Sequence, residues 1–84
     1  MKKILIYSKD ICPFCTKAKN LLQRKGVEFK EIKINSDELR QEMITKSGGR
    51  MTVPQIFIGD FHVGGCDDLY ALESAGKLNN LLGK

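Results

Sequence analysis

The stretch KDICPFCTKAKNLLQRKG, residues 9–26, holds two cysteines three positions apart with a proline between them. Beyond the second cysteine, three apolar residues recur at helical spacing: Ala18, Leu21 and Leu22. Gly26 then supplies the signal that commonly ends a helix. We therefore expect a helix over residues 12–25, with the cysteine pair at the point where a loop becomes that helix.

The rest of the chain predicts a mixed sheet with helices on both of its faces. Residues 3–8 form a short apolar run, as a strand buried on both sides would. A strand over residues 27–35 should run parallel to it through a right-handed crossover. The later expected elements are a helix from Ser36 to the KSGG at 46–49, a hairpin of strands 52–59 and 61–65 turning at Gly59 and Asp60, and a helix over 67–82 that SAGK can break after Ser74.

Length and composition favour a single domain over residues 1–84. No apolar run reaches the roughly 18 residues that a membrane span needs, and the start of the chain lacks the cleavage site of a signal peptide. These observations favour a cytoplasmic protein. The net charge of +4 is spread along the chain, and the few aromatic residues, with no Trp, do not interleave with the basic ones. We therefore expect no nucleic-acid partner.

The three cysteines leave several interpretations open. They cannot form a closed disulfide framework, which a cytoplasmic chain would not keep in any case. A metal site within one chain needs about four ligands, and beyond the pair only Cys66 and His62 are available, so no metal is expected. Two unreactive buried cysteines are a further alternative. His62 is interpreted as an ordinary surface or edge residue of its strand.

A reactive pair is the interpretation that the local pattern favours. With Pro13 at the first helical position, Cys12 would lie at the exposed amino end of the helix and Cys15 one turn further in. Free backbone N–H groups and the helix dipole favour a thiolate on Cys12, and Lys9 and Lys17 lie nearby in sequence. A stable thiolate is a good leaving group when a second thiol attacks a mixed disulfide.

Three blocks in order give the chain its resemblance to a known family: CPFC after the first strand, TVPQIFIG at 52–59 and GGCDDLYAL at 64–72. Over its whole length the chain resembles the glutaredoxins, specifically small bacterial dithiol glutaredoxins of the glutaredoxin 3 type. The resemblance implies the thioredoxin fold, in which a four-stranded mixed sheet is flanked by three helices. It also implies a glutathione-dependent thiol–disulfide oxidoreductase in which Cys12 is the nucleophile and Cys15 resolves the mixed disulfide.

The resemblance further implies a glutathione site. Lys9 and Arg40 would bind the glycine carboxylate, and a cis Pro54 would leave the Val53 backbone free to pair with the cysteinyl unit. At the other end, helix-start N–H groups would hold the γ-glutamyl carboxylate, with a carboxylate facing the ammonium group. The implied residues are Lys9, Phe14, Arg40, Thr52, Val53, Pro54, Cys66, Asp67 and Asp68. Solvated surface charges, dipole compensation by the two aspartates and an edge-strand start at TVP are the alternatives.

Two departures from the family pattern stand out. Phe14 replaces the tyrosine that is usual between the cysteines, and SGGRMTVP is one residue longer than the common form, which affects the alignment of Arg40 and Arg50. The expected partners are glutathione as co-substrate, with no bound cofactor, and disulfide-bonded or glutathionylated proteins, ribonucleotide reductase among them. We expect a monomer without a membrane partner. The functional alternatives are a thioredoxin-like electron donor and a glutathione-ligated iron–sulfur carrier.

Overall fold

The apolar run near the start of the chain becomes strand β1 (Ile4–Ser8) in the computed structural model, which describes residues 3–83. The other elements follow in chain order: α1 (Pro13–Arg24), β2 (Lys30–Lys33), α2 (Asp37–Lys46), β3 (Gln55–Ile58), β4 (Phe61–Gly64), α3 (Cys66–Ser74) and α4 (Leu78–Leu82). The strands form one sheet in the order β2-β1-β3-β4. β2 runs parallel to β1 and the other neighbours are antiparallel, so the predicted mixed sheet is confirmed.

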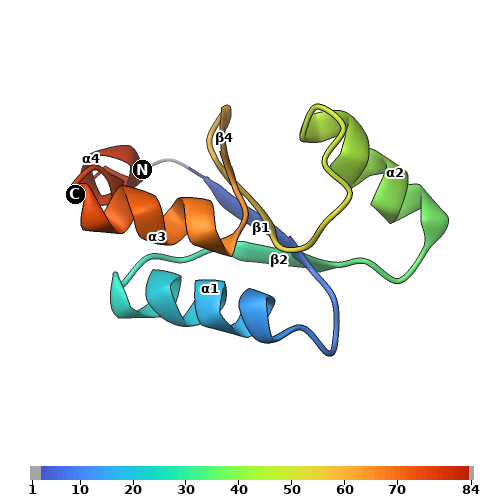
Figure 1. Ribbon diagram of the computed structural model, residues 1–84, viewed down its shortest axis with the longest axis horizontal. Helices are drawn as coiled ribbons and strands as arrows, with labels where there is room; N and C mark the ends of the chain where they lie inside the picture. Colours follow the sequence, from blue (N-terminus) through green and yellow to red (C-terminus); the bar gives the residue numbers. More distant parts are fainter. Residues whose placement is uncertain (1–2, 84) are drawn as a thin grey trace.

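The alternation of β1 builds a core on each face of the sheet. Ile4 and Ile6 face one cluster, which α1, α3 and α4 complete, whereas Leu5 and Tyr7 face a second cluster that includes Met43 of α2. Successive residues of a strand point to opposite faces, so a strand with apolar residues at every position needs cover on both sides. Figure 1 shows this cover: α1 and α3 lie together on one side, and α2 lies apart from them on the other.

The sheet topology gathers four chain segments at one end of the molecule. β1 and β3 are antiparallel, with Tyr7 opposite Gln55, so the loop after β1 lies beside the segment that enters β3. Gly64 at the end of β4 pairs with Ile56, which brings the start of α3 to the same end. The chain leaving β2 for α2 emerges there too, because β2 is parallel to β1. The cysteine motif and the TVP segment are therefore neighbours in space.

Three elements differ from the prediction. The strand expected over residues 52–59 begins only at Gln55. The strand expected over residues 27–35 is limited to Lys30–Lys33, because β2 is an edge strand that pairs with residues 5–8 of β1. The last helix is divided, within the described residues, into α3 and the short α4, at the SAGK sequence where a break was anticipated. Gly76 has a φ of 73°, a left-handed conformation that ends α3. Between residues 3 and 83, no helix is long and apolar enough to span a membrane.

Candidate active site

The dithiol occupies the amino end of α1, as predicted. Cys12 is the N-cap, Pro13 is the first helical residue, and the N–H of Cys15 donates to Cys12 Sγ at 3.2 Å. Cys12 and Cys15 are joined in a disulfide with their Cα atoms 5.2 Å apart. When this bond is reduced, the same N–H points at the Cys12 sulfur, and a hydrogen bond to the charged form favours the thiolate.

The two sulfurs differ in accessibility, although less simply than the sequence predicted. Cys12 is not openly exposed: only 8% of its surface is accessible, against 1% for Cys15. Cys12 nevertheless lines a surface cavity, whereas Cys15 is not among the residues that line it. An incoming sulfur can therefore approach Cys12 from the cavity, and Cys15 can be reached only through Cys12.

The charges around the dithiol are mainly basic. The first turn of α1 holds no acidic residue, and Asp10 in the preceding loop pairs with Lys33 at 3.1 Å. Lys9 lines the same cavity as Cys12. Lys17, in contrast, places its Nζ 4.8 Å above the ring of Tyr70 and so faces α3. Of the two lysines expected to favour the thiolate, Lys9 is the one that shares the cavity with Cys12.

The cavity beside Cys12 has a volume of about 500 Å³ and combines apolar walls with two cations. It is lined by Lys9, Ile11, Cys12, Pro13, Phe14, Ile34, Arg40, Met43, Met51, Thr52 and Val53. Lys9 and Arg40 come from different segments, the loop after β1 and the helix α2. Despite the extra residue before TVP, they line one cavity, which therefore offers two positive charges to an acidic ligand.

A second cavity, of about 300 Å³, lies over the start of α3. It is lined by Phe14, Arg50, Thr52, Val53, Pro54, Gly65, Cys66, Asp67 and Asp68. Phe14, Thr52 and Val53 line both cavities, which therefore meet next to Cys12. All nine residues implied for glutathione lie along this continuous groove, with cations at one end and a helix amino terminus at the other.

The α3 end of the groove is organised by Asp68. Its carboxylate accepts the N–H of Gly65 at 2.9 Å, which caps the helix, and lies 3.6 Å from the Arg50 guanidinium. Asp67, the residue before Asp68, is exposed. Cys66 is buried, and burial raises the pKa of its thiol, with Lys17 lowering it and Asp67 raising it further. Cys66 is thus a neutral thiol at the helix start.

The peptide bond between Val53 and Pro54 is cis, as the resemblance implied. Val53 is half-buried and Pro54 is buried. The segment entering β3 does not continue as a strand from residue 52, because β3 begins only at Gln55, and Val53 lines the groove instead.

Some groove residues were missed by the sequence analysis. Ile11, which is 89% exposed, and Met51, which is 62% exposed, form an apolar rim with Phe14, and Arg50 joins the second cavity. An apolar side chain directly before the first cysteine was the available signal for Ile11, since it lies in a loop with no core to enter. Between residues 3 and 83 no group of three His, Cys, Asp or Glu side chains is placed to hold a metal ion.

Fold and site together define a class, the thioredoxin-fold proteins that carry a CxxC dithiol at a helix start. The family model described as Glutaredoxin matches residues 4–63. The chain belongs to the glutaredoxin family, whose members are thiol–disulfide oxidoreductases.

Individual relatives agree with this assignment. The chain is 58% identical to a glutaredoxin of Pseudomonas aeruginosa, with 98% of each chain covered. It is 51% identical to glutaredoxin 3 of Escherichia coli, over 98% of this chain and 99% of that one. Among solved structures, a buckwheat glutaredoxin–glutathione complex superposes with a TM-score of 0.89 at 29% identity, covering 98% of this chain and 77% of that one.

Proposed function

We propose that this protein is a glutathione-dependent thiol–disulfide oxidoreductase that reduces glutathione mixed disulfides and protein disulfides. The observation that carries the proposal is the continuous groove beside Cys12. Lys9 and Arg40 offer a carboxylate site at one end, and the α3 start with Asp67 and Asp68 offers sites for a second carboxylate and an ammonium group at the other. Glutathione carries those three charges, with its thiol between them. The buckwheat relative, solved as a glutathione complex, supports the same ligand.

The first half of the proposed reaction is attack by the Cys12 thiolate. It attacks the glutathionyl sulfur of a mixed disulfide, forms a Cys12–glutathione disulfide and releases the substrate thiolate, which takes up a proton. A second glutathione, as its thiolate, then attacks the glutathionyl sulfur. Glutathione disulfide leaves and the Cys12 thiolate is restored, so the net exchange converts one mixed disulfide and one glutathione into the substrate thiol and glutathione disulfide.

Protein disulfides need Cys15 as well. After Cys12 has attacked such a disulfide, Cys15 attacks the Cys12 sulfur, closes the internal disulfide and releases the substrate as a dithiol. The 5.2 Å separation of the Cα atoms holds the two sulfurs within bonding reach, so this step has a high effective concentration. Two glutathione molecules reduce the internal disulfide again. The chemistry uses thiols alone, so we propose glutathione as co-substrate and no bound cofactor.

The same chemistry bears on the cellular location, the oligomeric state and the protein substrates. A cytoplasmic location accords with it, because that compartment keeps the glutathione pool reduced. A monomer suffices, since one chain supplies both ends of the groove. The apolar rim of Ile11, Phe14 and Met51 around Cys12 suits protein substrates, for which ribonucleotide reductase and glutathionylated proteins are the candidates.

The test is turnover of a small glutathione mixed disulfide with glutathione and glutathione reductase, run beside thioredoxin reductase. The wild type should turn over only with the glutathione system, and reduction by thioredoxin reductase alone would favour the thioredoxin-like alternative. Cys15→Ser should keep this activity but lose the reduction of protein disulfides, whereas Cys12→Ser should lose both. Retained activity in Cys12→Ser would reverse the assignment of the nucleophile.

The iron–sulfur alternative has its own measurement. The absorbance spectrum of the anaerobically purified protein, with its mass in solution, separates an apo monomer from a coloured dimer. We expect a colourless monomer that is active in the glutathione assay. A coloured dimer without that activity would replace the proposed function by the carrier.

A further inference from the structure

Gln55 is a fully buried polar residue whose amide is hydrogen-bonded at both ends. Its Nε2 donates to the Thr52 carbonyl oxygen at 2.9 Å and lies 3.3 Å from Thr52 Oγ1. Its Oε1 lies 2.8 Å from Nε2 of His62. Gln55 therefore joins the segment that borders the groove to strand β4, through contacts that the proposed reaction does not itself use.

Simple chemistry fixes the direction of these hydrogen bonds. A backbone carbonyl only accepts, so the NH₂ group of Gln55 faces Thr52 and its oxygen faces His62. That oxygen also only accepts, so Nε2 of His62 must carry the hydrogen. The neutral Nε2–H tautomer and the imidazolium both do so, and the link to Gln55 therefore persists in either protonation state.

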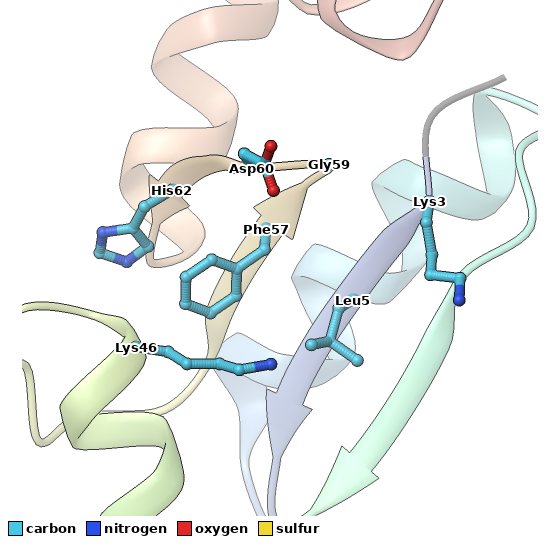
Figure 2. A pocket seen from close by; sticks show the side chains of 7 residues that line it. All are labelled: Lys3, Leu5, Lys46, Phe57, Gly59, Asp60 and His62. Atoms are coloured by element: carbon cyan, nitrogen blue, oxygen red, sulfur yellow. The ribbon is translucent and has the colours of Figure 1, made fainter.

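His62 is itself held in place by stacking. Its ring lies on that of Phe57, with the centroids 4.8 Å apart and an interplanar angle of 25°, and Figure 2 shows the two rings side by side. The other residues around them, including Lys46 and Asp60, line a cavity of about 340 Å³ that contains none of the groove residues. His62 is therefore a half-buried anchor at the sheet edge, and more constrained than the ordinary edge residue predicted from the sequence.

The segment that Gln55 holds is supported by the packing of Val53 against the second core cluster but has few hydrogen bonds. Thr52 and Val53 precede β3, and among the described residues no backbone hydrogen bond outside the helices and strands involves positions 51–54. Both residues line the two cavities that meet beside Cys12. The amide of Gln55 is thus the hydrogen-bonding group that ties this stretch of groove wall to the sheet.

We propose that Gln55, oriented by His62, is a positioning residue that sets the Thr52–Val53 backbone against Cys12 for glutathione. This inference rests on the proposed function and deepens it. Val53 can pair with a peptide ligand only if its backbone is held at a fixed height above the dithiol, and the Gln55 amide supplies that constraint. A disulfide without peptide groups makes no use of it.

The test compares two substrates in three variants. Gln55→Leu keeps the volume and removes the donor, His62→Phe keeps the stacked ring and removes the hydrogen on Nε2, and Lys46→Ala alters the cavity beside His62 without touching the network. Steady-state assays at a fixed glutathione concentration give the KM for a glutathione mixed disulfide, whose glutathionyl group occupies the groove. Stopped-flow assays give the rate at which the reduced protein attacks a small aromatic disulfide without peptide groups.

We expect the KM for the glutathione mixed disulfide to rise about five- to tenfold in Gln55→Leu and about two- to threefold in His62→Phe. The rate with the aromatic disulfide should stay within about twofold of wild type, and Lys46→Ala should match wild type in both assays. If Gln55→Leu does not fold, the KM of His62→Phe tests the positioning role. An unchanged KM in the folded variants, or equal losses with both disulfides, overturns the positioning role. If the wild type shows no glutathione turnover, the proposed function itself is overturned. This result comes from the wild-type protein and is independent of the variants.

Discussion

At the scale of single residues, three features of the site act on the sulfur of Cys12: the helix dipole, the N–H of Cys15 and Lys9, which lines the same cavity. Each favours the charged form of the thiol. The first turn of α1 has no acidic side chain to oppose them. Cys66 provides an internal contrast, since burial raises the pKa of its thiol.

The first prediction concerns the acidity of these two thiols. In the reduced Cys15→Ser variant, the pKa of Cys12 should lie well below that of a free cysteine, because the thiolate is hydrogen-bonded and faces positive charge. Ultraviolet thiolate absorbance against pH should show one step in the acidic-to-neutral range and a second, from Cys66, in the alkaline range. Cys66→Ser is the control that removes the second step alone. A single alkaline transition in Cys15→Ser would contradict the helix-start argument.

Arg40 provides the second prediction. Arg40→Ala should raise the KM for a glutathione mixed disulfide about two- to tenfold, because one charged hydrogen-bonding partner of the carboxylate is lost from the groove. The difference from wild type should shrink at high salt, since this charge is exposed. Lys46→Ala removes a positive charge from the same helix away from the groove and should leave the KM unchanged. Equal effects of the two changes would point to the general field of α2 instead of a specific contact.

At the scale of elements, the junction between β4 and α3 depends on Gly64. Its φ of 112° is one that side-chain-bearing residues rarely adopt, and a Cβ there would collide with the carboxylate of Asp68. That carboxylate caps α3 through the N–H of Gly65. The start of α3, which borders the groove, therefore requires a residue without a side chain at position 64.

Gly64→Ala should accordingly destabilise the protein by about 2–4 kcal/mol, from backbone strain together with loss of the cap. Gly76→Ala is the matched control: its φ is 73°, but nothing lies within 4 Å of the added Cβ. It should cost about 1–2 kcal/mol, from strain alone. Urea unfolding measures both. Equal losses would show that Asp68 moves aside without consequence for α3.

The whole molecule couples stability to pH through the half-buried His62 on the acid side of neutrality and through the buried Cys66 and Tyr7 on the alkaline side. Burial and Arg50 lower the pKa of His62, with Asp68 opposing them. The unfolded chain therefore takes up a proton near pH 6.5 that the folded chain does not yet bind. Burial, then the hydrogen bond to Glu42, raises the pKa of Tyr7. The unfolded chain loses that proton near pH 10 while the folded chain keeps it.

The free energy of unfolding should therefore be greatest between about pH 6.5 and about pH 8.5. It should fall as the pH drops below about 6.5, where the unfolded state binds more protons, and fall again as the pH rises above about 8.5, where first Cys66 and then Tyr7 lose protons in the unfolded state. Urea titrations across the pH range measure this. His62→Phe should flatten the acid limb near about pH 6.5, and Tyr7→Phe the part of the alkaline limb above about pH 10. If a variant leaves the corresponding part of the pH dependence unchanged, the substituted residue does not contribute to it.

Much of the fold could be predicted because its signals are local. The spacing of Ala18 and Leu21, the proline after Cys12 and the turn at Gly59 each depend on contacts a few residues apart. Strand β2 was overestimated, because its length is set by how many residues of β1 remain to pair with it. Pairing partners distant in sequence leave no local signal.

The sequence by itself predicted the reactive pair and its immediate setting: a dithiol at the start of a helix and a second helix start with two aspartates. The cis proline came from the resemblance to the family. Only the tertiary structure decided what surrounds these features. The groove exists because the sheet gathers distant segments at one end. Parallel pairing of β2 with β1 brings Arg40 of α2 to the cavity of Lys9, and pairing of β4 with β3 brings Asp68 of α3 to Arg50. Antiparallel pairing of β1 with β3 sets the loop after β1 beside the TVP segment, about forty residues away in sequence. The same pairing buried Gln55, and a buried amide must find partners wherever the fold supplies them, here on Thr52 and His62.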